Sequence, residues 1–170
     1  MQGNVLSVLV DNHAGVLARI SSLFGRRGFN IDSLSVSATN DPNLSRITIV
    51  VSGGGAELEQ IISQTEKLIE TRAVFLVEPS MGVQRELLLL KVAANESNRA
   101  SLREIAGIYK AKIIDLSPNS MIFELTGEPE KIDAFLQMFA NYAILELCRT
   151  GITALQRGEP TYQLKERLLP

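Results

Sequence analysis

Hydrophobic residues along this chain switch between a spacing of two, typical of strands, and a spacing of three to four, typical of helices. In the first half, the expected strands cover residues 4–10, 33–39, 46–51 and 73–77, and the expected helices cover residues 16–24 and 58–69. The apolar stripe of the first helix consists of Val16, Leu17, Ile20, Leu23 and Phe24. Gly28 is the expected end of that helix. The element order is therefore β-α-β-β-α-β.

The same order begins again after residue 82. Expected strands cover residues 87–93, 112–116, 121–126 and 143–148, and expected helices cover 99–109 and 129–139. A repeat of about eighty residues fits two small domains rather than a solenoid. We predict an α+β protein with two tandem ferredoxin-like domains, residues 1–79 and 83–157, each a four-stranded antiparallel sheet with two helices on one face. The polar C-terminal tail, residues 158–170, is expected to be poorly ordered.

The sheet face turned away from the helices is also apolar, at Val5, Leu9 and Val50. We expect that face to pack against the other domain, a second copy or a partner. The strand over residues 33–39 should lie at the sheet edge, and it carries neither proline nor charge to block pairing with another strand. Edge-to-edge association into a homodimer is therefore a second expectation.

The amino-acid composition narrows the classes of function that the chain can have. The chain is 45% hydrophobic and 21% charged, with a formal net charge of −2 and a sequence pI near 5.5. A nucleic-acid-binding protein normally carries a basic face. RNA-recognition domains share the βαββαβ order but place aromatic residues on the first and third strands. Neither strand carries an aromatic residue here, so we expect no nucleic-acid partner.

Candidate catalytic chemistry is missing from the sequence. Cys148 and His13 are the single cysteine and the single histidine, too few for a zinc site or a disulfide. The glycines at 53–55 lack the lysine that follows in a phosphate-binding loop, and no serine lies in a nucleophile elbow. We expect no catalytic residue and no metal site. No signal peptide or membrane-spanning segment is recognisable, so a cytoplasmic protein without a membrane partner is expected.

Residues 12–15, Asn-His-Ala-Gly, form one distinctive loop between the first strand and the first helix. A helix N-terminus offers free N–H groups to an anion, glycine permits close approach, and the Asn12 amide can both donate and accept. This loop suits a zwitterionic amino acid. The same residues also fit a purely structural interpretation, in which Asn12 caps the helix and Gly15 only makes the turn.

Longer stretches carry a family resemblance. Residues 6–12 (Leu-Ser-Val-Leu-Val-Asp-Asn), residues 15–20 (Gly-Val-Leu-Ala-Arg-Ile) and residues 26–34 (Arg-Arg-Gly-Phe-Asn-Ile-Asp-Ser-Leu) closely resemble an ACT domain. More narrowly, they resemble the small regulatory subunits of acetolactate synthase. Residues 41–46 and 112–115 fit the same family. One departure is Ala14, where many ACT domains carry proline.

The resemblance implies a regulatory subunit without a catalytic site. Its partner is the large catalytic subunit, which holds thiamine diphosphate, Mg²⁺ and FAD and which it activates, while valine or another branched-chain amino acid binds and confers feedback inhibition. The implied effector site lies between two chains of a homodimer, and its residues are Asn12, His13, Ala14, Gly15, Val16 and Leu17 from one chain and Asn30 and Ile31 from the other. The alternative is a free-standing amino-acid sensor that controls another enzyme or a transcription factor.

Overall fold

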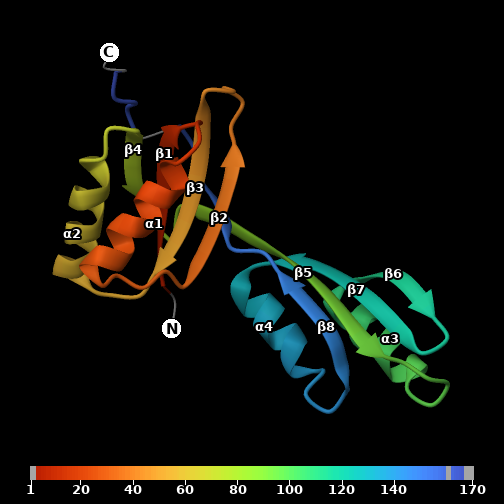
Figure 1. Ribbon diagram of the computed structural model, residues 1–170. Coiled ribbons are helices and arrows are strands. Elements are labelled where there is room, and N and C mark those ends of the chain that lie inside the picture. The colour runs from red at the N-terminus through yellow and green to blue at the C-terminus, as the bar shows by residue number, and fades with distance from the viewer. Residues whose placement is uncertain (1–2, 160–161, 167–170) are drawn as a thin grey trace. The chain divides into compact units, whose positions relative to one another are not determined.

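Two compact units make up the chain, shown in Figure 1 as a computed structural model that describes residues 3–159 and 162–166. The first unit joins the residues up to Val83 with those from Ile152 onward, and the second unit is Gln84–Gly151. The chain therefore leaves the first unit, builds the second and returns to the first.

The first unit has the expected element order. Its elements are β1 (Asn4–Asp11), α1 (Val16–Arg27), β2 (Ser33–Ala38), β3 (Leu44–Val51), α2 (Gly55–Glu66) and β4 (Thr71–Leu76). The antiparallel sheet runs in the order β2-β3-β1-β4, and α1 and α2 lie against one face of it (Figure 1). The strand order confirms that β2 is an edge strand.

Alternation in β1 and β3 decides which face is buried under the helices. Leu6, Val8 and Val10 of β1 and Ile47 and Ile49 of β3 are almost fully buried in one core. They pack with the α1 stripe of Val16, Ile20 and Phe24. Helix α1 ends where expected, because Gly28 adopts the left-handed conformation with φ 73°.

Two apolar residues that the helical pattern places inward are exposed instead. Leu17, in the first turn of α1, is 42% exposed. Ile69 is 67% exposed because α2 ends at Glu66, three residues before it. The N–H groups of Leu68 and Thr71 bond to the carbonyls of Thr65 and Leu68, and these turns lead the chain into β4.

The second unit repeats the arrangement. Its elements are the main part of β5 (Gly82–Ala93), α3 (Arg99–Tyr109), β6 (Lys112–Ser117), β7 (Ser120–Gly127), α4 (Pro129–Gln137) and β8 (Ile144–Arg149), with strand order β6-β7-β5-β8. Leu88, Leu90 and Val92 face the helices and are fully buried, together with Phe123 and Phe135. The α+β class and the two tandem βαββαβ units are as predicted.

The outer face of the first sheet is covered by the returning chain. Ile152 and Ala154 are buried against Val5, Val50 and Val77. A short strand there, β9 (Thr153–Gln156), pairs with β5 and was not predicted from the sequence. The expected second domain, 83–157, therefore ends too late, because its last residues complete the core of the first unit.

The C-terminal tail also differs from expectation. Of residues 158–170, the stretches 160–161 and 167–170 lie outside the described residues. Within residues 162–166, Tyr162 stacks on Phe75 of β4 with ring centroids 4.6 Å apart. The N–H of Lys165 donates to the carbonyl of Arg72 at 2.9 Å. A polar composition did not predict these specific contacts.

None of the helices within residues 3–159 has the length and apolarity required to cross a bilayer.

Candidate functional site

The loop of residues 12–15 connects β1 to α1. Gly15 has φ 91°, in the left-handed region that favours glycine, and its carbonyl accepts the N–H of Arg19 at 3.0 Å. A Cβ built on Gly15 meets nothing within 4 Å, so the space in front of the helix is open. The loop therefore needs glycine for its backbone and leaves room beside it.

The N-terminus of α1 has no side-chain cap. Gly15, which carries no side chain, stands at the N-cap position and supplies no side-chain hydrogen bond to the first turn of the helix. The structural interpretation of Asn12 as the cap is therefore wrong, because both groups of its side chain bond elsewhere. A helix start without a cap keeps N–H groups and a positive dipole end available for an anion.

The side chain of Asn12 fixes the loop against the turn between β2 and β3. Its Nδ2 donates to the carbonyl of Pro42 at 2.9 Å, and its Oδ1 accepts the hydroxyl of Ser45 at 2.9 Å. The N–H of Asn12 also donates to the carbonyl of Asn43. A carboxamide has two N–H donors and two acceptor lone pairs, so one of each is left over at this exposed residue.

The other predicted residues of this loop are mostly at the surface. His13 and Ala14 are exposed, and Nδ1 of His13 lies 3.0 Å from the carbonyl of Ala14. Val16 is buried in the core, and Leu17 projects with 42% of its surface exposed. Leu17 therefore offers an apolar contact beside the helix start, while Val16 anchors it.

Asn30 and Ile31 lie at the other end of α1. Asn30 is exposed and its Nδ2 donates to Asp32 Oδ1 at 2.5 Å, while Ile31 packs half-buried against the core. The twelve residues of α1 separate the two ends by about 18 Å at 1.5 Å per residue. One chain therefore does not bring the two parts of the predicted site together.

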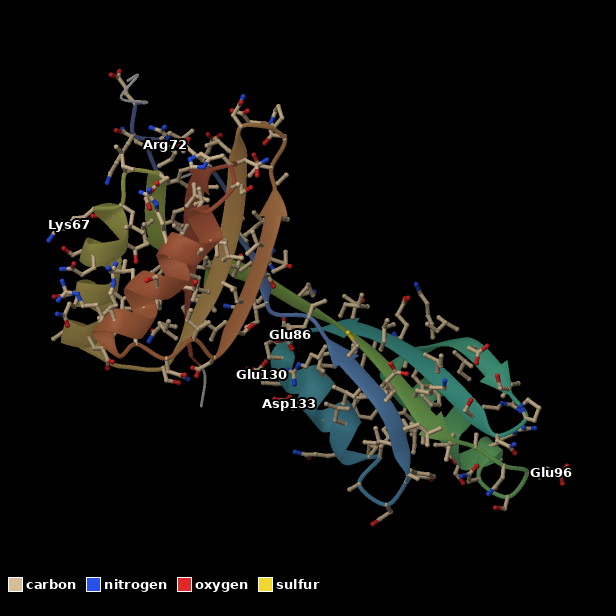
Figure 2. All side chains as sticks on the ribbon, viewed as in Figure 1. Lys67, Arg72, Glu86, Glu96, Glu130 and Asp133 are labelled. Atoms are coloured by element: carbon tan, nitrogen blue, oxygen red, sulfur yellow. The ribbon has the colours of Figure 1, made fainter. Side chains whose placement is uncertain are left out.

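Sequence reasoning missed a buried ion pair at the base of the loop. Arg72 on β4 donates from Nε and Nη2 to the two carboxylate oxygens of Asp11 at 2.8 and 2.7 Å. Arg72 is only 8% exposed, and Figure 2 labels it on β4 beside the C-terminal segment. The available signal was the single charged residue of β4, but its partner is 61 residues away in sequence.

The second unit fills the corresponding loop with its own side chains. The N–H of Ala94 bonds to the carbonyl of Asn119, just as Asn12 bonds to Asn43, so these two loops occupy equivalent places. In the second loop, however, Asn95 Oδ1 accepts the N–H groups of Ser97 and Asn98. The N–H groups of Asn12, His13 and Val16 bond to main-chain carbonyls. The two repeats therefore differ in whether a side chain of the loop accepts the N–H groups before the helix.

The element order and the loop geometry together define a class of protein. Two βαββαβ units, with a glycine loop before the first helix of the first unit, have the arrangement of ACT-type domains. Residues 6–73 match the family described as the AHAS small subunit-like ACT domain, and residues 85–158 match the family described as the small subunit of acetolactate synthase.

Whole-chain relatives agree with both matches. The chain is 43% identical to the probable acetolactate synthase small subunit of Methanothermobacter thermautotrophicus, over 93% of this chain and 95% of the relative. It is 45% identical to the acetolactate synthase small subunit of Mycolicibacterium smegmatis, over 91% of each. The chain belongs to the acetolactate synthase small subunit family.

A solved structure supports the fold. The crystal structure of the acetolactate synthase small subunit from Thermotoga maritima superposes with a TM-score of 0.87 at 36% identity, covering 94% of this chain and all of that one. The family and the fold are therefore as predicted from the sequence.

Proposed function

We propose that this chain is a regulatory subunit that binds valine, or another branched-chain amino acid, and controls the catalytic subunit of acetolactate synthase. In this proposal it activates that subunit and confers feedback inhibition on it. The observation that carries the proposal is the left-handed Gly15 loop at the start of α1, with the Asn12 amide fixed beside it. Thiamine diphosphate, Mg²⁺ and FAD are assigned to the catalytic subunit.

The start of α1 suits the carboxylate of an amino acid. Free N–H groups of the first helical turn donate to it, and the helix dipole favours its negative charge. Gly15 lets the carboxylate approach the backbone closely. Asn12 adds one donor and one acceptor, held in position by the turn at Pro42.

Two exposed apolar residues suit a branched side chain and a second copy. Leu17 is 42% exposed and Val36, on the edge strand β2, is 45% exposed. Burying the part of each side chain that is still exposed is worth about 1 kcal/mol. Both lie in the first unit on elements next to the loop, which favours an apolar effector over a polar one.

Pairing of β2 with β2 of a second copy completes the site. Asn30 precedes β2, and Asn12 is bonded to the turn that follows β2. In an antiparallel pair related by two-fold symmetry, the start of one strand lies beside the end of the other. Asn30 and Ile31 of one copy therefore come beside the loop of the other, which one chain alone does not achieve.

The first unit rather than the second is the proposed sensor. In the second unit, Asn95 and Asn98 satisfy the N–H groups before α3, so an incoming carboxylate would have to displace them. No glycine stands in that loop. We therefore assign the effector to residues 12–17 together with residues 30 and 31.

Two measurements test this proposal. Calorimetric titration of the purified chain with L-valine, L-leucine and L-alanine should show binding of the branched compounds and much weaker binding of alanine. Co-purification should recover a large thiamine-dependent subunit, whose acetolactate formation rises on adding this chain and falls again with valine. A chain that binds branched amino acids without this partner would instead support the free-standing sensor.

A further inference from the structure

Residues 162–166, hereafter the C-terminal strap, lie along the exposed edge of β4. β4 ends the strand order β2-β3-β1-β4, so its outer hydrogen-bonding edge is open to another strand. The strap is attached there at two points, Tyr162 on Phe75 and Lys165 on Arg72. Because 162 faces 75 and 165 faces 72, the strap runs antiparallel to β4.

Further contacts fix the end of the strap. Nζ of Lys165 donates to the carbonyl of Glu66 at 2.8 Å, at the C-terminal end of α2, where a cation also suits the helix dipole. Nη1 of Arg72 donates to the carbonyl of Glu166 at 2.9 Å. The strap therefore contacts both the main chain and the side chain of Arg72.

Arg72 occupies a β-bulge that points it away from the regular ladder. Leu9 pairs with Ala73 and Val10 pairs with Thr71, which leaves Arg72 as the extra residue between them. Its guanidinium bonds to both carboxylate oxygens of Asp11 on one side and to the strap on the other. Asp11 immediately precedes the loop of residues 12–15.

The second unit has the same bulge without this device. There Lys91 pairs with Glu146 and Val92 pairs with Ile144, which leaves Leu145 in the position of Arg72. Ala93 stands in the place of Asp11, by the equivalence of Ala94 with Asn12. Both units therefore contain the bulge, but only the first unit combines it with the arginine, the carboxylate and the strap.

The strap and the loop also border one cavity. A cavity of about 640 Å³ is lined by His13 of the loop, by Glu70 and Arg72 at the start of β4, and by Lys165 and Glu166 of the strap. Release of the strap would open one wall of this cavity and expose Nη1 of Arg72 to solvent.

We propose that the C-terminal strap stabilises the effector loop through Arg72, so that strap docking and effector binding strengthen each other. Arg72 is a positioning residue that holds Asp11, and Asp11 fixes where the loop begins. The link from strap to loop stands on the contacts above, whereas the link to the effector rests on the proposed function.

Single substitutions in the full chain separate the strap from the rest. Lys165→Pro removes the N–H that bonds to Arg72. Leu164→Pro is the matched control, since the N–H of Leu164 donates to no main-chain carbonyl in the part of the chain that the structure describes. Lys165→Ala keeps the N–H and removes only the ammonium. Tyr162→Ala releases the strap independently by removing the stack on Phe75.

The first measurement needs no effector. Hydrogen exchange at the N–H of Asn12, which is bonded to Asn43, reports the opening of the loop. We expect Lys165→Pro and Tyr162→Ala to speed this exchange at least about fivefold relative to Leu164→Pro, when each variant is measured at the same interval below its own melting temperature. Equal exchange in all of these variants would overturn the proposal.

The second measurement uses L-valine as the probe. Lys165→Pro should weaken valine binding at least about fivefold relative to Leu164→Pro. Lys165→Ala loses the Nζ bond to Glu66 but keeps the main-chain bond to Arg72, so it should weaken binding less than Lys165→Pro does. By reciprocity, valine should slow exchange of the Lys165 N–H in the unmodified chain by the same factor. Equal valine affinities in the two proline variants would overturn the coupling between strap and effector. If the unmodified chain does not bind valine, the proposed function is wrong, and hydrogen exchange at Asn12 alone then tests whether the strap stabilises the loop.

Discussion

Asn12 is bonded to Pro42 across the sheet end, with Nδ2 donating to the carbonyl at 2.9 Å. The contact ties the loop before α1 to the turn after β2, although the two residues lie 30 positions apart. The orientation of the Asn12 side chain is therefore set by the first unit itself, before any effector binds. A preorganised polar group of this kind loses less entropy on binding than a mobile one.

Replacing Asn12 with alanine should weaken valine binding about tenfold. The substitution removes a hydrogen bond to a charged ligand group, worth roughly 1.5 kcal/mol, and loosens the loop. Asn43→Ala is a suitable control, because it removes an amide in the same turn but leaves the carbonyl that receives Asn12 N–H. Calorimetry should show the loss for Asn12→Ala alone. A similar loss in both variants would mean that the turn, not the Asn12 side chain, matters.

Replacing Gly15 with aspartate should abolish valine inhibition while stimulation of the catalytic subunit is kept. A carboxylate about 4 Å from that of the effector repels it by roughly 4 kcal/mol at an effective dielectric near 20, and half of that weakens binding more than about tenfold. The backbone at Gly15 is left-handed, with φ 91°, so any side chain adds strain.

Gly15→Asn separates charge from strain. Asparagine has nearly the same shape as aspartate and tolerates the left-handed region similarly, but it is neutral. Valine inhibition should survive in Gly15→Asn and disappear in Gly15→Asp, in activity assays of the reconstituted holoenzyme. Unchanged inhibition in Gly15→Asp would remove this loop from the effector site.

Val36→Lys should weaken the proposed homodimer at least about tenfold. Val36 projects from the edge strand β2 with 45% of its surface exposed, and a charge there would be buried on pairing. Ile69→Lys is the matched control, an exposed apolar residue of the same unit that lies away from β2. Light scattering across a concentration series measures the shift. A monomeric unmodified chain at micromolar concentration, with valine present, would argue against β2 pairing.

The sequence was sufficient for the element order because burial follows local periodicity here. Leu34 in β2 and Leu88 in β5 lie on the expected faces of their sheets, and α1 ends at Gly28 as the sequence predicts. The inward positions expected for Leu17 and Ile69 were wrong, because the spacing of apolar residues does not reveal where a helix starts or ends.

Long-range partners were beyond such reasoning. β9 has four residues and pairs with β5, although α3, β6, β7, α4 and β8 lie between them in the sequence, so no local pattern predicts it. Asp11 and Arg72 likewise become neighbours only once the strand order and the bulge are known. For the candidate site, the sequence supplied the loop and its glycine, but the open helix start depended on where Asn12 bonds.

Arg149→Met should destabilise the second unit by roughly 2–3 kcal/mol. Nε of Arg149 donates to Glu86 Oε2 at 2.7 Å and Nη1 donates to Asp133 Oδ1 at 2.6 Å, and Figure 2 labels both acidic partners. Burial by itself lowers the pKa of Arg149, but the bonds to Asp133 and Glu86 outweigh it and raise the pKa above the ordinary value. Removing the cation leaves Glu86, only 6% exposed, without this partner.

Arg85→Met provides the comparison for that loss. The pair of Arg85 with Glu128 is exposed on both sides, so its removal should cost less than about 1 kcal/mol. Urea unfolding of the two variants, followed by a probe of the second unit, measures the difference. Equal stabilities would show that the Arg149 cluster is as well solvated as a surface pair.

Deleting the second unit should leave a folded first unit, provided that the returning segment is kept. Joining Val83 to Ile152 through a short Gly-Ser linker keeps Ile152 and Ala154 in the core of the outer sheet face, together with the bond from Arg157 N–H to the carbonyl of Met81 at 2.7 Å. A chain ending at Val83 instead uncovers the outer sheet face.

Ile152 alone is 93% buried in the intact protein, so its loss should cost at least about 2 kcal/mol of unfolding free energy. We therefore expect a clearly lower urea midpoint for the truncated chain, and valine binding within a few-fold of the full chain for the linked one. If both forms unfold at the same midpoint, the residues after 151 contribute nothing to the first core, and the domain predicted from the sequence, residues 1–79, is complete.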